Sequence, residues 1–293
     1  MTSDAVETAG ISILRSVHGT SLNRVDGKGK GQAVAVDQSL SESQAGGRPG
    51  ALIGLISNPR STRNRHQLPD IRAFVARHAN IFHVELKDIS DLPEALRLMA
   101  QAQPRVLVVN GGDGTVQATL TALVHARPFG DTPPPVAVLP NGKTNLIAND
   151  LGISGAPLKA LARILELSPG DLNRHTVERS LIALDDGKRA WPVLGMFMGG
   201  AGLMEAILYC RSRIYPLGLP EPVSHLLAFV ILVGSILIGR QLGLGDGQMK
   251  ITVRRAGALE GRFFVIMVTT LEKLVLGVRQ ATSGIGGTLK IMC

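Results

Sequence analysis

Residues 108–116 read Val-Val-Asn-Gly-Gly-Asp-Gly-Thr-Val, an apolar run that leads into three glycines around one aspartate. The uniformly apolar residues 106–109 predict a parallel strand that is covered on both faces, and residues 116–124 predict the helix that follows it. Ligands of open parallel sheets bind at the carboxyl ends of the strands. We therefore expect a ligand loop at this strand-to-helix turn.

Similar units lie on both sides of this stretch. Strands are predicted at residues 51–57, 81–86 and 136–139. A helix is predicted over residues 68–79, and Asp91 with Glu94 has the spacing of a capping box that begins another. The alternation of strands and helices predicts right-handed crossovers, and hence a doubly wound, mostly parallel α/β domain over residues 51–170.

The two ends of the chain differ from this core in composition. Residues 1–50 carry five basic and five acidic residues among Gly, Ser, Ala and Gln, which predicts a disordered N-terminal arm, with a short helix over residues 11–17 as the alternative. We expect residues 171–293 to form a β-rich, antiparallel, sandwich-like domain with an Asp-Asp-Gly hairpin turn at 185–187. Its strands are predicted at 176–184, 190–198, 249–255 and 262–269, and its helices near 203–211 and 223–238.

Composition and charge bound the class of protein. The 293 residues suffice for two domains, and 31 basic against 23 acidic residues give a net charge of +8. This balance favours polyanions, phosphate-bearing ligands or an anionic membrane surface as partners. An aromatic content of 3% without a stacking module argues against a nucleic-acid binder. Only two cysteines, and no secretory pattern at the start, lead us to expect a cytoplasmic protein.

Residues 226–239 form an uncharged apolar stretch that is shorter than the roughly 20 residues of a membrane-spanning helix. Two interpretations stay open for it: a helix buried in the β-rich domain, or peripheral contact with the inner face of a membrane. Trp191, Met196 and Met198 are expected in the core.

The residue types of the glycine-rich turn suggest a phosphate site. Its glycines let the backbone approach a phosphate chain, and amides from Thr115 onward can face the anion. Asp113 is suited to hold Mg²⁺ directly or through water. The alternative is that the glycines only form a sharp turn while Asp113 caps the helix. Spacing alone does not separate the two interpretations.

Two further loops follow predicted strands. Residues 139–145 read Leu-Pro-Asn-Gly-Lys-Thr-Asn, but a P-loop would need glycine where Ala137 stands, so that motif is excluded. Lys143 in this loop still suits a phosphate. Residues 57–65 carry three arginines, which suit either a polyphosphate or a solvated basic loop: Arg60, Arg63 and Arg65. We expect the three loops to meet at one edge of the sheet.

Taken together, these motifs resemble the diacylglycerol kinase-like lipid kinases, a family that includes bacterial lipid kinases and sphingosine kinases and shares its nucleotide domain with NAD kinases. Residues 111–115 match the family's Gly-Gly-Asp-Gly-Thr in full, and Asn58-Pro59 with Ser61 is similar to its first nucleotide loop. The second signature is matched at Pro140, Gly142, Asn145, Ala148, Leu151 and Gly152. The likeness covers residues 50–293 and is strongest through residue 167, while residues 200–206 resemble the start of the family's β-sandwich.

The resemblance implies a two-domain kinase that binds Mg-ATP and transfers the γ-phosphoryl group to a lipid hydroxyl at a membrane surface. It implies Asp113 as a catalytic residue and metal ligand. The nucleotide-binding residues that it implies are Asn58, Gly111, Gly112, Asp113, Gly114, Thr115, Asn141, Gly142, Lys143, Thr144 and Asn145. A homodimer is a further expectation.

The chain also departs from the family pattern. The family's late Asp-Gly-x-Leu, whose aspartate acts as base for the acceptor hydroxyl, aligns with Gly-Gly-Thr-Leu at 286–289, which holds no carboxylate. Glu205 is the candidate substitute base. Other replaced positions are Lys143, Thr144, Leu146 and Asn149 in the second signature and Gln117-Ala118 after the first. Two alternatives therefore stay open: a nucleotide- or lipid-binding regulator, and an NAD kinase-like enzyme.

Overall fold

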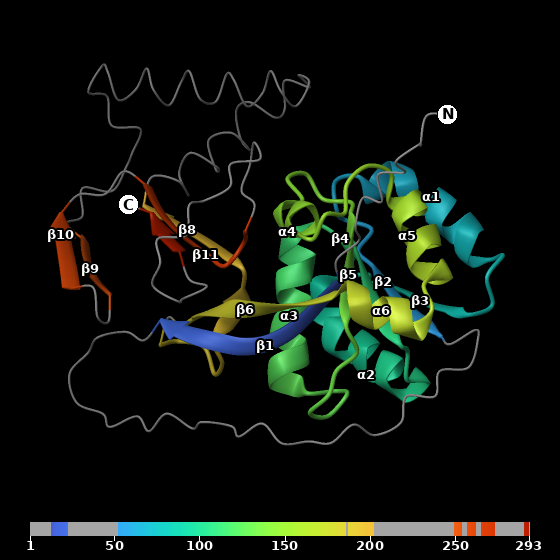
Figure 1. Ribbon diagram of the computed structural model, residues 1–293, viewed down its shortest axis with the longest axis horizontal. Helices are drawn as coiled ribbons and strands as arrows, with labels where there is room; N and C mark the ends of the chain where they lie inside the picture. Colours follow the sequence, from blue (N-terminus) through green and yellow to red (C-terminus); the bar gives the residue numbers. More distant parts are fainter. Residues whose placement is uncertain are drawn as a thin grey trace, which may run out of the picture. The chain divides into compact units, whose positions relative to one another are not determined.

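The computed structural model describes residues 13–22, 52–185, 187–201, 249–253, 257–261, 265–272 and 290–292 (Figure 1). The chain divides into two compact units, which we describe separately: Met1–Met196 with Leu271–Ile285, and Phe197–Thr270 with Gly286–Cys293. The first unit holds a sheet with a parallel α/β core, and the second holds antiparallel strands. The predicted fold class, a parallel α/β domain followed by a β-rich domain, is confirmed.

A seven-stranded sheet organises the first unit, with the strand order β3-β2-β4-β5-β1-β6-β7. Strands β3, β2, β4 and β5 are parallel to one another, as the apolar runs predicted. The strands of this sheet are β1 (Ile13–Leu22), β2 (Ile53–Ser57), β3 (Ile81–Glu85), β4 (Val106–Gly111), β5 (Val136–Pro140), β6 (Thr176–Leu184) and β7 (Val193–Gly195).

Helices cover both faces of the parallel strands. Right-handed crossovers between the parallel strands place α1 on one face of the sheet and α2 and α3 on the other. Helix α5 contacts α1, and α2 contacts α3, so each face carries a pair of helices (Figure 1). The helices are α1 (Asn64–Val75), α2 (Leu92–Ala102), α3 (Asp113–Ala126), α4 (Leu146–Asp150), α5 (Pro157–Glu166) and α6 (Pro169–His175), with the 3₁₀ helix η1 (Ile89–Asp91) before α2.

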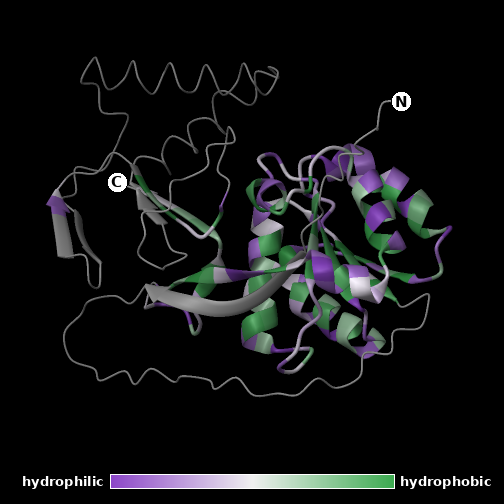
Figure 2. Ribbon diagram, viewed as in Figure 1, coloured by the Kyte–Doolittle hydropathy of each residue, from purple (hydrophilic) through white to green (hydrophobic). Residues whose placement is uncertain are grey.

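This double cover explains the uniformly apolar strands. Every residue of β2, β4 and β5 is buried, and Leu55, Val108 and Leu139 have no exposed surface. The helices instead show hydrophilic and hydrophobic stripes (Figure 2). Full burial of one such aliphatic side chain contributes about 1.5–3 kcal/mol, so the central strands are the main source of stability in this unit.

The strand order creates a branching point between β2 and β4. The chain leaves β2 through α1 toward β3, and it leaves β4 through α3 toward β5 on the other side of the sheet. Open α/β sheets bind ligands at such a branching point, outside the carboxyl ends of the strands. Two of the three predicted ligand loops, those after β2 and β4, begin here.

Strand β1 corrects the prediction for the N-terminal arm. Composition predicts disorder throughout residues 1–50, but Ile13–Leu22 forms a strand that runs parallel to β6 and antiparallel to β5. Pairing along nearly the whole length of β6 supplies main-chain hydrogen bonds, which a compositional rule does not count. The rest of the arm lies outside the described residues.

The predicted hairpin around residues 185–187 is present, because β6 pairs in antiparallel fashion with β7. Both strands follow residue 170 and belong to the sheet of the first unit. The outer edge of β7 contacts α3 through Thr121. Its Oγ1 accepts the Leu194 N–H at 3.0 Å, and its hydroxyl hydrogen has two carbonyl acceptors within reach, Gln117 at 2.9 Å and Leu194 at 3.2 Å. A side chain thus covers polar groups that an edge strand would otherwise expose.

Trp191 was predicted to lie in the core, and this prediction is wrong. The residue is 64% exposed, and its ring stacks on His125 at a centroid distance of 5.4 Å. It lies in the segment that precedes β7 and is not part of that strand. Met196 is buried as predicted, and Met198 is half-buried.

The capping box predicted between Asp91 and Glu94 is also wrong. Asp88 forms the box instead: its Oδ1 accepts the Ser90 N–H at 3.1 Å, and Asp91 Oδ2 accepts the Asp88 N–H at 2.9 Å. Glu94 pairs with Arg97 on the exposed side of α2. The 3₁₀ turn before α2 moves the first unpaired amides about one turn earlier, which is where the cap forms.

The described strands of the second unit are antiparallel, as predicted. One sheet has the order β12-β11-β8, and β9 pairs with β10 in another. The run predicted at 190–198 is divided between β7 and β8. The bounds are β8 (Phe197–Ala201), β9 (Met249–Val253), β10 (Gly257–Gly261), β11 (Val265–Thr269) and β12 (Lys290–Met292).

The expected helices near 203–211 and 223–238, and the apolar stretch 226–239, lie outside the described residues. Among the residues that the structure does describe, no helix combines the length and the apolar character needed to cross a membrane.

We expect Thr121→Val to lower the free energy of unfolding of the chain by about 1–3 kcal/mol. Valine keeps the shape of threonine but leaves the buried N–H and C=O of Leu194 without their partner. Chemical denaturation followed by circular dichroism measures the change. Thr132→Val, at an exposed position, is the control and should change stability by less than about 0.5 kcal/mol. Equal stability of the two variants would show that β7 does not depend on Thr121.

Candidate functional site

The three loops predicted to share one edge meet at the carboxyl ends of β2, β4 and β5. The Gly112 N–H donates to Ser61 Oγ at 3.3 Å, which joins the loop after β4 to the loop after β2. The Arg63 N–H donates to the Asn141 carbonyl oxygen at 3.1 Å, which joins the loop after β2 to the loop after β5. The parallel sheet therefore assembles one site from three separate stretches of sequence.

A direct backbone contact joins the loops after β4 and β5. A Cβ atom at Gly142 would lie 2.4 Å from Gly112 Cα, and one at Gly112 would lie 3.0 Å from Gly142 Cα. At Gly111 a Cβ would meet the Thr115 side chain at 2.8 Å. These glycines let the loops pack. Gly114 differs, because it is exposed and a Cβ there would meet no atom within 4 Å, so the open side of the site lies at the start of α3.

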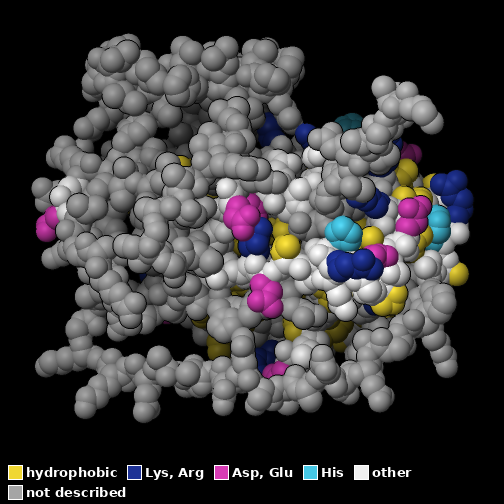
Figure 3. Space-filling view, viewed as in Figure 1, with side chains coloured by type: hydrophobic (Ala, Val, Ile, Leu, Met, Phe, Trp, Pro, Cys, Tyr) yellow, Lys and Arg dark blue, Asp and Glu magenta, His cyan; other side chains and the backbone are white. Residues whose placement is uncertain are grey.

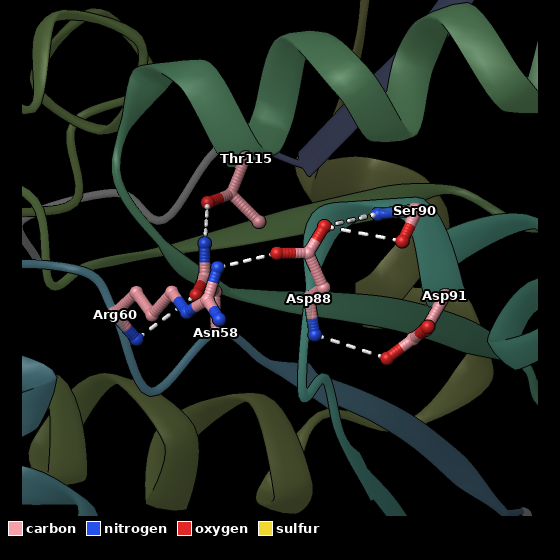
Figure 4. Close-up of polar contacts among 6 residues, drawn as sticks. All are labelled: Asn58, Arg60, Asp88, Ser90, Asp91 and Thr115. Carbon is pink, nitrogen blue, oxygen red and sulfur yellow. Dashed lines mark hydrogen bonds and ion pairs between the residues drawn. The ribbon is translucent and has the colours of Figure 1, made fainter.

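Asn58, a predicted nucleotide-binding residue, links two of the loops with its side chain (Figure 4). Its Nδ2 donates to Thr115 Oγ1 at 2.9 Å, and its Oδ1 accepts the Arg60 N–H at 3.0 Å. The structure thus brings Asn58 and Thr115 together, although 57 positions separate them in the sequence. Their hydrogen bond holds the start of α3 against the loop after β2.

Arg60 forms an ion pair with Asp88 at the end of β3, and both side chains are exposed (Figure 4). Hydrogen bonds from the backbone and hydroxyl of Ser90, with the nearby Arg60, hold the pKa of the Asp88 carboxyl below its usual range. The other two arginines of the loop lie elsewhere: Arg63 is half-buried and Arg65 is exposed in the first turn of α1. Asp88 was not among the predicted site residues, and its sequence context signals only a cap.

Asp113 binds the backbone of a neighbouring helix. Its Oδ2 accepts the Leu146 N–H at 3.1 Å, and its Oδ1 accepts the Ile147 N–H at 3.0 Å. The carboxylate therefore caps α4 and not its own helix α3, which neither interpretation of the sequence foresaw. Each carboxylate oxygen can accept more than one bond, so this cap leaves capacity for a cation. Asp113 is half-buried beside the exposed Gly114.

The loop after β5 is closed by Asn145, which adopts the left-handed conformation at φ 54°. Its Oδ1 accepts the Gly142 N–H at 2.7 Å, and its Nδ2 donates to the Gly142 carbonyl oxygen at 3.2 Å. Between these residues, Lys143 is half-buried and Thr144 is exposed. The side chains of Asn141 and Asn145 are thus engaged inside the protein, and Thr144 is the exposed member of the predicted set in this loop.

Two buried asparagines that the sequence analysis did not select hold the loops from below. The Asn110 carbonyl oxygen accepts the Asn58 N–H and Asn64 Nδ2, both at 3.0 Å. Asn64 Nδ2 also donates to the Asn58 carbonyl oxygen at 2.8 Å. Asn110 ends an otherwise apolar strand, which is a usable signal in the sequence. Asn64 follows a basic loop and has no such signal.

The remaining predicted site residues lie outside the described residues: Glu205, and the positions 286–289 at which the family's late aspartate is replaced. Within the described part of the chain, no group of three or more His, Cys, Asp or Glu side chains is arranged to hold a metal ion. A cation at Asp113 would therefore take most of its ligands from a bound phosphate chain and from water, which is how proteins commonly bind Mg²⁺.

Comparison with known proteins agrees with this arrangement. The family model for the diacylglycerol kinase catalytic domain matches residues 53–173, which contain all three loops. A relative from Stenotrophomonas maltophilia (strain K279a), described as a YegS-like lipid kinase, is 28% identical over 181 residues, which cover 50% of this chain and 55% of the relative. The chain thus spans little more than half the length of this relative. The resemblance predicted from the motifs is confirmed.

A solved structure supports the fold. A crystal structure from Bacillus anthracis str. Sterne, described as a diacylglycerol kinase, matches with a TM-score of 0.50 at 19% sequence identity, covering 78% of this chain and 68% of that one. At this identity the likeness concerns the fold.

Gly142→Ala should lower the free energy of unfolding by about 2–4 kcal/mol, because the new methyl group would force the Gly112 backbone to move. Gly114→Ala is the matched control: the methyl group meets open space in a helix, so we expect stability to stay equal or to rise by up to about 1 kcal/mol. Thermal and urea denaturation measure both. A Gly142→Ala variant as stable as the parent would contradict the close contact of the two loops.

Proposed function

We propose that this chain, whose residues 53–173 match the family model for the diacylglycerol kinase catalytic domain, transfers the γ-phosphoryl group of Mg-ATP to a lipid hydroxyl. The observation that carries the proposal is the convergence of three loops at the branching point of the sheet, with the open side at Gly114. Phosphoryl transfer requires alignment and charge neutralisation more than covalent chemistry, and a rigid edge of backbone amides suits that task.

In this proposal the triphosphate lies over the start of α3. The exposed Gly114 permits close approach, and the positive end of a 14-residue helix favours an anion. Lys143 and Thr144, in the loop after β5, lie on the adjoining part of this edge. Arg60, held by Asp88 at the end of β3, is a further cation beside the same loops. These residues are the proposed contacts to the nucleotide.

The residues present fit a magnesium ion at Asp113. The carboxylate is fixed by two amides of α4, is half-buried, and stands next to the open position at Gly114. One carboxylate with several phosphate and water oxygens is a common magnesium environment. When bound, Mg²⁺ neutralises charge on the phosphate oxygens. The role proposed for Asp113 is to hold the magnesium ion next to the start of α3.

A lipid acceptor fits the kinase family and the net charge of +8, which favours an anionic membrane surface. On the face of the first unit drawn in Figure 3, the described basic side chains lie beside acidic ones and form no patch of a single sign. We propose that contact with the membrane is peripheral and that the β-rich second unit binds the lipid.

One observation favours the alternative of a non-catalytic regulator. Residues 286–289 read Gly-Gly-Thr-Leu where the family has its base, so deprotonation of the acceptor would need another group. Glu205 is the proposed substitute. A regulator would bind Mg-ATP without turnover, whereas the kinase would release ADP and label a lipid.

We expect purified protein incubated with γ-labelled ATP, Mg²⁺ and a mixed lipid extract to yield a labelled lipid on chromatography. Asp113→Asn should lower this yield by about 100-fold or more, because charge next to the transferred group is lost. Asp131→Asn, an exposed carboxylate paired with Arg127, is the control and should leave the yield unchanged. Glu205→Gln should also lower the yield if Glu205 is the base.

Circular dichroism of each variant keeps folding separate from chemistry, since Asp113 also caps α4. Binding of Mg-ATP with no labelled product from any lipid class would overturn the kinase and favour the regulator. An Asp113→Asn variant with full activity would remove the metal role.

A further inference from the structure

Four polar side chains lie in a row across the carboxyl end of the parallel sheet. His83 comes from β3, Ser57 from β2, Asn110 from β4, and Asn141 from the residue after β5. The row follows the strand order β3-β2-β4-β5, so each parallel strand is represented by one member. Ser57, Asn110 and Asn141 have no exposed surface, and His83 is half-buried.

Hydrogen bonds connect the row from end to end. Asn141 Nδ2 donates to Asn110 Oδ1, Asn110 Nδ2 donates to Ser57 Oγ at 2.9 Å, and Ser57 Oγ lies 2.8 Å from His83 Nε2. Because Ser57 already accepts from Asn110, its hydroxyl hydrogen is available for the Nε2 of a neutral imidazole. All the bonds then point toward β3, an arrangement in which each hydrogen bond polarises and strengthens the next.

The row also holds the loops of the candidate site. The Asn110 carbonyl oxygen accepts the N–H of Asn58, the residue whose side chain reaches Thr115. The Asn141 carbonyl oxygen accepts the Arg63 N–H, and Gly142 follows directly in the contact with Gly112. A displacement of Asn110 or Asn141 would therefore be transmitted to all three loops.

We infer that His83 is a positioning residue for the nucleotide site: as the final acceptor of the row, its neutral imidazole holds the three loops in the arrangement that binds Mg-ATP. It does this through Ser57, Asn110 and Asn141, without touching the ligand. The inference rests on the proposed function for the identity of that ligand, and it adds a residue from outside every motif of the site.

The protonation state of His83 decides the direction of the last hydrogen bond in the row, between Ser57 Oγ and His83 Nε2. Burial lowers the pKa of His83, while the charge of Glu85 raises it and that of Arg72 lowers it. Glu85 and Arg72 are bonded to each other at 2.6 Å, so their opposite charges stay together. Above the lowered pKa the imidazole is neutral and accepts. As the pH falls through that pKa, Nε2 gains a hydrogen, Ser57 Oγ faces two donors, and its own hydrogen loses its acceptor.

The test measures binding of Mg-ATP by isothermal titration calorimetry at about pH 7.5. His83→Leu removes the final acceptor beside a buried hydroxyl, and the Kd should rise about tenfold. His83→Gln places an amide oxygen near the Nε2 position and should stay within about twofold of the parent. His78→Leu is the matched control: His78 is half-buried in the turn after α1, its Nδ1 lies 2.7 Å from the Phe74 carbonyl oxygen, and its loss should not change the Kd.

A pH series supplies a readout that a purely structural role would not change. As the pH is lowered from about 6.5, the ordinary pKa of histidine, toward about 4.5, the affinity of the parent should fall more steeply than that of His83→Gln, which has no imidazole at this position. The triphosphate itself takes up a proton in this range, so the ratio of the two Kd values is the quantity compared. A ratio that stays constant with pH overturns the inference.

The two proposals fail in different ways. A parent protein that binds no Mg-ATP refutes the proposed function, and the inference about His83 falls with it. If the parent binds Mg-ATP and a folded His83→Leu variant binds it with the same Kd, only the inference about His83 is refuted. If His83→Leu does not fold, Ser57→Ala takes its place: it removes the bridging hydroxyl and keeps the ring, and the same tenfold rise is expected.

Discussion

The contact between the backbones of Gly112 and Gly142 is the constraint on which the candidate site depends. A single Cβ atom at Gly142 would lie 2.4 Å from Gly112 Cα, so the two loops reach this separation only as glycine against glycine. Their approach brings Asp113 within bonding distance of α4 and Asn141 within bonding distance of Asn110.

Asp113 combines an observed structural part with the chemical part proposed above in one carboxylate. A flexible carboxylate would lose conformational entropy when it binds a cation, whereas one held by the Leu146 and Ile147 amides has lost that freedom on folding. The cap thus prepares the charge for a ligand. The same bonds also tie the glycine-rich loop after β4 to the loop after β5, so a displacement of either loop also moves the carboxylate or its partners.

The support beneath these loops is neutral. Asparagine can donate and accept at the same time, so Asn110 and Asn141 continue a hydrogen-bonded row through the buried end of the sheet without a charge. Buried charges there would carry a large desolvation cost and would add a field next to a site proposed for a polyanion. Charged groups lie at the edges instead, as with Arg60 and Asp88.

The sequence by itself determined the parallel core and the meeting of the three loops, because uniformly apolar runs such as 106–109 record burial on both faces and parallel strands end at a common edge. It also identified Asp113 and its glycines through a local motif. Only the tertiary structure decided which helix Asp113 caps, that Ile13–Leu22 pairs with β6, that Trp191 is exposed, and that His83 contacts Ser57 and Asn64 contacts Asn110. Each of these depends on whether a residue 25 or more positions away in the sequence packs against the segment, and the local pattern of residues does not predict such contacts.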